Sequence, residues 1–111
     1  MLTYGNIVNY ILEKFYRYEW DDTKDASNAK KHRNLDMQDG SEVFLDNARF
    51  IRKDERFDYG ECRYIAIGNV RGVILSVCFT LRGFLKRRLI SVRYASRKER
   101  RLYYGNDSYD S

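Results

Sequence analysis

Residues 73–80 have the sequence Val-Ile-Leu-Ser-Val-Cys-Phe-Thr. Apolar side chains occupy nearly every position from 73 to 79, as expected for a central strand that is covered on both faces. Turn sequences bound the stretch on both sides, Asn-Val-Arg-Gly at 69–72 and Leu-Arg-Gly at 81–83. The stretch therefore predicts a strand in the middle of a sheet.

On either side of this stretch, periodicity, turn residues and helix caps predict the remaining elements. The expected strands are residues 15–20, 48–52, 63–68, 73–80 and 85–94. The expected helices are residues 7–15, 23–33 and 96–104, with a single helical turn at 42–46 and a punctuating turn at 39–41. Asp21-Asp22 and Ser96 are the expected N-caps. We expect an α+β fold in which an antiparallel meander carries helices on one face.

Composition indicates one small basic domain. The 111 residues include 21 Lys and Arg against 16 Asp and Glu, a formal net charge of +5. A chain of this length can bury a core without disulfides. Cys62 and Cys78 are interpreted as small buried hydrophobic residues, and a redox role is the alternative. Because His32 is the single histidine and the two cysteines lack a C-x-x-C spacing, no zinc site is expected. No cofactor, no signal segment and no membrane span are expected, and the predicted location is the cytoplasm.

The basic residues are concentrated near the end of the chain. Glu99 is the only acid between residues 82 and 101, and tyrosines lie alongside at 94, 103 and 104. The bases of this block are Arg82, Lys86, Arg87, Arg88, Arg93, Arg97, Lys98, Arg100 and Arg101. Arginine binds phosphate with bidentate geometry, so nucleic acid is the leading candidate partner. A solvated cationic face, or a surface for an acidic protein, is the alternative.

Strict alternation along residues 85–94 places Arg87, Leu89, Ser91 and Arg93 on one face of the strand. Arg88, Ile90 and Val92 fall on the other face, so at least one arginine is expected to face the helices or to snorkel past them.

Two other groups could take part in acid–base chemistry. His32 has an ordinary pKa near neutrality and is a candidate general acid or base, with a structural role as the alternative. The carboxylates Asp54, Glu55, Asp58 and Glu61 are interpreted as a solvated turn, with acid–base work as the alternative.

Several fragments, in order and spacing, resemble the BrnT family of ribonuclease toxins from bacterial type II toxin–antitoxin systems. They are Glu-Trp-Asp at 19–21 with Lys24, Asn28 and Lys-His at 31–32; Val-Phe at 43–44 with Asp46; Asp-Tyr-Gly-Glu at 58–61 with Arg63; Ile-Gly at 67–68; Phe-Thr at 79–80 before Arg-Gly at 82–83; Arg-Leu-Ile-Ser-Val-Arg at 88–93 with Ala95; and Arg-Lys-Glu-Arg at 97–100 with Tyr103. The resemblance covers residues 18–104, with an N-terminal extension over 1–17 and a polar tail over 105–111.

The resemblance implies a small RelE-like domain and metal-independent RNA cleavage that inhibits translation. It also implies a cognate BrnA-like antitoxin that neutralises the toxin and binds DNA, so that the toxin itself meets DNA only indirectly. Two positions depart from the family pattern: Arg33 stands where members usually have glycine, and Phe57 where they usually have histidine. The second change removes a titratable group; if that histidine contributes to catalysis in the family, we expect this chain to rely on His32 or on arginines, or to be a catalytically weakened homologue.

Metal-independent cleavage proceeds by attack of a ribose 2′-hydroxyl on the adjacent phosphate, which needs proton transfer and positive charge. We expect Arg82, Arg88 and Arg93 to supply the charge, and His32, with Lys24 on the same helix, to move the protons. The expected RNA-binding residues are Lys86, Arg87, Ser91, Arg97, Arg100 and Tyr103. Two alternatives remain: a nonenzymatic nucleic-acid-binding module, and a basic surface that mainly receives an acidic antitoxin segment.

Overall fold

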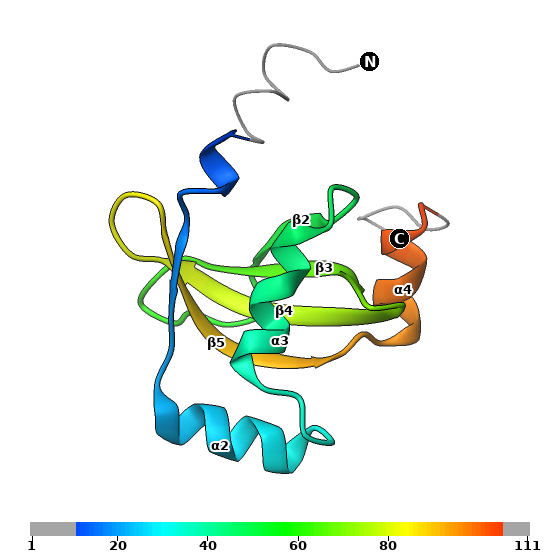
Figure 1. Ribbon diagram of the computed structural model, residues 1–111, viewed down its shortest axis with the longest axis horizontal. Helices are drawn as coiled ribbons and strands as arrows, with labels where there is room; N and C mark the ends of the chain where they lie inside the picture. The colour runs from blue at the N-terminus through cyan, green and yellow to red at the C-terminus, as the bar shows by residue number, and fades with distance from the viewer. Residues whose placement is uncertain (1–10, 106–111) are drawn as a thin grey trace.

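A five-stranded mixed sheet forms the frame of the protein in the computed structural model, which describes residues 11–105 (Figure 1). The strands are β1 (Arg17–Glu19), β2 (Phe50–Asp54), β3 (Arg63–Val70), β4 (Val73–Leu81) and β5 (Lys86–Tyr94). The helices are α2 (Asp22–Lys31), α3 (Met37–Ser41), the 3₁₀ turn η1 (Glu42–Leu45) and α4 (Arg97–Tyr103). Their order confirms the expected α+β class.

The strand order is β1-β5-β4-β3-β2, which puts β4 in the middle as its apolar sequence predicts. Strands β2 to β5 pair antiparallel with their sequence neighbours. β1 joins the other side of β5 in parallel, so the expectation of an antiparallel meander is wrong for the sheet as a whole. Beyond β1 the edge of β5 is closed by α2, because the Asn28 side-chain oxygen accepts from the Val92 amide at 3.0 Å.

The larger core lies between the sheet and the α3–η1 segment, which crosses the front of the sheet in Figure 1. Met37 and Phe44 are fully buried there against Val77 and Val92. α3 approaches closely because residue 40 is glycine: a Cβ at this position would lie 3.2 Å from the Val92 Cβ. Close packing of this kind explains why a five-residue helix forms over 37–41, where we expected only a turn.

Within residues 11–105, the opposite face of the sheet is covered at one end, by α4. Ile65, Ile67 and Ile74 form a second core cluster with Ala95, and Tyr103 packs against it. The expectation that all helices pack on one face is therefore wrong. α4 covers one end of the opposite face because Ser96 and Glu99 form a capping box that starts it directly after β5.

A β-bulge in β5 changes which residues share a face. Cys78 pairs with Ser91 but Phe79 pairs with Leu89, so Ile90 is the extra residue. Strict alternation fails at this point. Arg88, Ser91 and Arg93 consequently share the face that carries α4, called the open face below.

Local differences from the expected elements are small. β2 begins at Phe50 and ends at Asp54, two residues later than predicted, and the strand expected over 15–20 shortens to β1. The helix expected over 7–15 lies partly outside the described residues; within them, 11–16 form a helical turn with three i→i−3 hydrogen bonds. The polar tail after residue 105 also lies outside the described residues.

Candidate active site

A pocket of about 410 Å³ opens on the open face of the sheet, between β2, β5 and α4. Four of its lining side chains are cationic and come from separate elements. The lining residues are Arg52, Arg56, Arg93, Ser96, Lys98, Glu99 and Leu102. Positive charge converging on one concavity is what a phosphate group requires.

Arg93 is held in this pocket by a buried carboxylate. Its two terminal nitrogens donate to the two Glu99 oxygens at 2.5 and 2.9 Å, a bidentate pair. Glu99 also accepts from the Ser76 hydroxyl and the Ser96 amide, each at 2.9 Å. Burial by itself raises the pKa of Glu99, but the Arg93 guanidinium and these donors outweigh it and hold the pKa below its ordinary value. Glu99 is therefore ionised at neutral pH and fixes the orientation of Arg93.

His32 lies at the C-terminal end of α2, where it is the C-cap residue. Partial burial lowers the pKa of His32 below its ordinary value, and the positive charges of Lys31 and Arg93 lower it further. The imidazole is thus neutral at physiological pH and can accept a proton. His32 is not among the residues that line the pocket, although it lies close enough to Arg93 for the two charges to interact.

Lys24 does not accompany His32. It lies exposed in the first turn of α2, eight residues earlier, which corresponds to about 12 Å along a helix axis. Lys98 of α4 is the one lysine among the described residues that line the pocket.

The other expected catalytic arginines lie outside the pocket. Arg88, on the open face, has a 3.5 Å contact with Glu19 of β1. Arg82 lies at the β4–β5 turn and donates to Glu61 at 2.7 Å. The three arginines therefore do not converge on one point, and only Arg93 lines the pocket.

Four expected RNA-binding residues lie on or beside the open face. Ser91 and Lys86 belong to β5 and pair with Cys78 and Arg17, respectively. Arg97 begins α4 and is exposed, and Arg100 donates to the Ala95 carbonyl at 2.8 Å.

Arg87 is placed elsewhere, against expectation. Its side chain is 7% exposed on the α3 face of the sheet, where it forms a bidentate ion pair with Glu13. Its guanidinium carbon lies 3.6 Å from the Tyr16 ring centroid and 4.0 Å from that of Phe44. Arg87 is therefore a buried structural group and cannot contact RNA in this fold.

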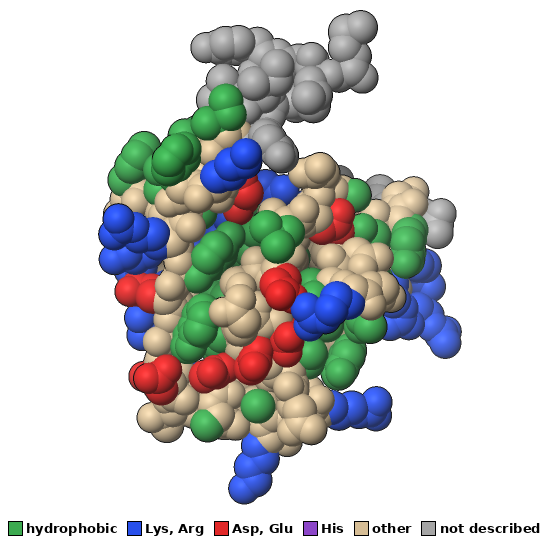
Figure 2. Space-filling model, in the orientation of Figure 1, with side chains coloured by type: hydrophobic (Ala, Val, Ile, Leu, Met, Phe, Trp, Pro, Cys, Tyr) green, Lys and Arg blue, Asp and Glu red, His purple; other side chains and the backbone are tan. Residues whose placement is uncertain are grey.

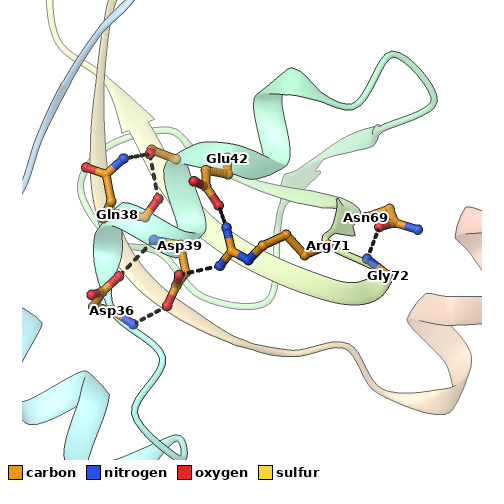
Figure 3. Close-up of polar contacts among 8 residues, drawn as sticks. Asp36, Gln38, Asp39, Glu42, Asn69, Arg71 and Gly72 are labelled. Carbon is orange, nitrogen blue, oxygen red and sulfur yellow. Dashed lines mark hydrogen bonds and ion pairs between the residues drawn. The ribbon is translucent and has the colours of Figure 1, made fainter.

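Tyr103 is also directed away from the pocket. Its hydroxyl donates to Asp46 at 2.6 Å, and this hydrogen bond raises the pKa of Tyr103 to about 12. It lines a different depression of about 500 Å³ at the β3–β4 turn, together with Glu42, Asp46 and Arg71. Arg71 bridges Asp39 and Glu42 there, so its charge is matched by two carboxylates (Figure 3).

The face around this second depression has the wrong charge for a phosphate. Figure 2 shows acidic side chains in a row across the face that α3 covers. The segment from residue 21 to residue 46 carries seven Asp and Glu against four Lys and Arg, whereas residues 82–101, apart from Arg87 on the α3 face, carry eight Lys and Arg against one Glu. The molecule thus has an acidic face and a basic face, and the pocket with Arg93 lies on the basic one.

The pattern of the basic block missed Arg52 and Arg56, because both lie some 30 residues before it. The signal that could have found Arg52 is the alternation of β2, in which Phe50, Arg52 and Asp54 point to the open face. Lys98 and Glu99 belong to the basic block and to the family fragment at 97–100, but neither is among the site residues that the sequence predicts.

The expected solvated turn after β2 is only partly solvated. Asp54 is 3% exposed and accepts from Arg56 and Tyr59, whereas Glu55 and Asp58 are exposed. Cys62 is exposed, against expectation, and Cys78 is half-buried on the open face with its pKa raised by burial.

Within residues 11–105, no three His, Cys, Asp or Glu side chains gather as metal ligands would. No helix in the same range is long and apolar enough to cross a bilayer.

Comparison with known proteins bears on the whole of this arrangement. Residues 20–99 match the family described as the ribonuclease toxin BrnT of type II toxin–antitoxin systems. A search of curated proteins gives no match. Among solved structures, the crystal structure of the Brucella abortus ribonuclease toxin BrnT is similar, with 31% sequence identity and a TM-score of 0.55. The similarity covers 74% of this chain and 99% of the Brucella chain. The match spans β2 to β5 and the start of α4, including Arg52, Arg93 and Glu99, and the chain therefore belongs to the BrnT family of ribonuclease toxins.

Proposed function

We propose that this chain is an endoribonuclease that cleaves RNA without a metal ion, using the pocket on the open face. The RelE-like fold expected from the family resemblance is part of the proposal. The observation that carries it is the convergence of Arg52, Arg56, Arg93 and Lys98 on one concavity of the basic face. An RNA phosphate is the anion that best fits such a site, and the acidic α3 face disfavours binding on the other side.

In the proposed reaction the ribose 2′-hydroxyl attacks the adjacent phosphorus and the bond to the 5′-oxygen breaks, which leaves a 2′,3′-cyclic phosphate. Neutral His32, at the C-terminal end of α2, takes the proton from the 2′-hydroxyl, so the RNA in the pocket must also reach the end of α2; its lowered pKa keeps a nitrogen lone pair available. Arg93, with its orientation set by Glu99, donates to the phosphoryl oxygens as negative charge builds. Lys98, which replaces Lys24 as the candidate, protonates the departing 5′-oxygen.

The test is incubation of purified protein with end-labelled RNA in EDTA. We expect cleavage by the wild type, and a loss of about 10²- to 10³-fold in rate when Arg93 is removed, the usual effect of one transition-state donor. Because Arg93→Ala alone would strand the buried Glu99 charge, the informative variant combines Arg93→Ala with Glu99→Gln. Arg71→Ala, on the opposite face, is the matched control and should cleave like the wild type.

Two results would contradict the proposal. RNA binding without cleavage by the wild type would favour a nonenzymatic binding module. Equal cleavage by the wild type and the Arg93/Glu99 double variant would place the reaction elsewhere.

We also propose that cleavage inhibits translation and that a BrnA-like, DNA-binding antitoxin neutralises it by covering the basic face. An acidic antitoxin segment fits this face, so the antitoxin and RNA should compete. Expression of the chain in a bacterium should arrest incorporation of labelled amino acids, and co-expression of the antitoxin should restore it. An antitoxin that binds equally well in the presence of saturating RNA would contradict the shared surface.

A further inference from the structure

The loop between β2 and β3, residues 55–62, carries an exposed aromatic side chain next to the pocket. Phe57 is 67% exposed and directly follows Arg56, a lining residue. A large ring left in water beside a cluster of cations suits a ligand that combines a flat aromatic surface with negative charge.

Hydrogen bonds to Asp54 fix the conformation of the loop. Asp54, whose side chain is fully buried, accepts from the Arg56 Nε at 2.8 Å and from its Nη2 at 2.9 Å. The same carboxylate accepts from the Tyr59 hydroxyl at 3.1 Å. Together these bonds hold the pKa of Asp54 at about 2, chiefly through the Arg56 hydrogen bonds. One buried anion therefore positions both a pocket cation and the aromatic residue that supports Phe57.

Arg63, Tyr59 and Phe57 contact one another in succession, and Phe57, the last of them, is exposed to solvent. The Arg63 guanidinium lies 4.1 Å from the centroid of the Tyr59 ring. The Tyr59 ring meets the Phe57 ring edge to face, with centroids 5.8 Å apart. Phe57 is the outermost member, and its exposed surface is open to one more flat group.

We propose that Phe57 is the stacking platform for an unpaired nucleobase of the RNA whose phosphate enters the pocket. The inference rests on the proposed function and adds to it a substrate class: single-stranded RNA, because a base inside a duplex is already stacked and cannot reach a protein ring. Recognition by stacking tolerates any base, so Phe57 sets affinity and strand form rather than sequence.

The experiment measures binding of two fluorescein-labelled hexanucleotides, 2′-O-methyl-uridine and a 2′-O-methyl backbone without bases. The 2′-O-methyl group blocks the attacking hydroxyl, so binding is read without cleavage. Phe57→Ala should weaken binding of the base-bearing probe by about 5-fold to about 150-fold and leave the abasic probe unchanged. Phe57→Tyr should restore binding. Lys98→Ala is the phosphate control, and it should weaken both probes equally.

The fold tolerates the change, because Phe57 is mostly exposed and outside both core clusters. Equal affinity of the wild type for the two probes, or an unchanged Kd in Phe57→Ala, would overturn the stacking proposal. Neither result touches the proposed ribonuclease activity, which fails separately if unmodified RNA remains intact in EDTA. A duplex of the same length that binds as tightly as the single strand would overturn the substrate class.

Discussion

The buried ion pair between Glu13 and Arg87 ties the N-terminal segment, which precedes the family match, to the core. Glu13 accepts three guanidinium N–H bonds, one from Arg49 and two from Arg87, and a fourth bond at 3.0 Å from Tyr18. The Glu13 side chain is 16% exposed and that of Arg87 only 7%. Glu13→Gln removes the charge while keeping the size of the side chain.

The expected loss follows from the bonds themselves. Charge-assisted hydrogen bonds are about twice as strong as neutral ones, so neutralising the acceptor of three guanidinium bonds costs about 1 kcal/mol for each. The sum, about 3 kcal/mol, is at the lower end of the range of about 3–5 kcal/mol for a buried charge that loses its partner. Because small domains are stable by about 5–15 kcal/mol, Glu13→Gln should fold but unfold at clearly lower denaturant.

Urea unfolding followed by circular dichroism measures this loss, and a double variant separates its cause. If the stranded Arg87 charge is responsible, Arg87→Met added to Glu13→Gln should recover much of the stability, because an apolar side chain suits a site lined by Tyr16 and Phe44. Glu19→Gln is the matched control, because Glu19 forms only a surface pair with Arg88, and it should cost less than about 1 kcal/mol. A Glu13→Gln variant as stable as the Glu19→Gln control would refute the reasoning.

Four further perturbations have defined outcomes. The pKa of Asp54 is held at about 2 in the folded protein, below its ordinary value of 3.8. Asp54 therefore contributes about 2 kcal/mol of stability above pH 4, and this contribution is lost as the pH falls toward 2. Asp54→Asn should remove the contribution at pH 7, and acid unfolding monitored by fluorescence measures both effects. The lowered pKa of His32 predicts that the cleavage rate rises with pH through a value below 6.5 and then levels off, and His32→Gln should abolish that limb of the pH–rate profile. Arg33 has φ of 55°, a conformation that favours glycine, so Arg33→Gly should raise the free energy of unfolding by about 1 kcal/mol whereas Arg33→Ala should not. Gly68→Ala should destabilise by about 1–3 kcal/mol in the same urea assay, because its Cβ would lie 2.9 Å from a Val43 methyl and 3.1 Å from the Val43 carbonyl oxygen.

The positive φ at Arg33 gives a physical reason for the glycine of the family pattern, whereas nothing in the structure explains the arginine of this chain. Glycine, the usual residue there, adopts a positive φ without a Cβ penalty, and this chain keeps the conformation with an arginine. The other departure, Phe57, places an apolar ring on the loop that follows β2, next to the pocket residue Arg56.

Local patterns in the sequence were sufficient for β3, β4, β5, α2 and α4, because each signal is complete within its own residues. The apolar run of β4 specifies a central strand, and Asp21 and Ser96 satisfy the first amides of their helices wherever those helices pack. The order and spacing of the family fragments also indicate a BrnT relative. They can be recognised in the sequence without knowing which residues meet in the folded protein.

Which side chains meet depends on interactions between distant segments. Alternation assigns Arg88 and Arg93 to opposite faces, yet one bulged residue, Ile90, puts them on the same face, because the register of β5 is set by its pairing with β4. Arg87 belongs to the basic block in sequence but is turned into the core, where Glu13, 74 residues away, compensates its charge. Arg52 and Arg56 join Arg93 only because the sheet brings β2 and α4 to one pocket. Charge in a sequence window predicts that a basic surface exists, whereas strand register and buried counter-charges select the arginines that form it.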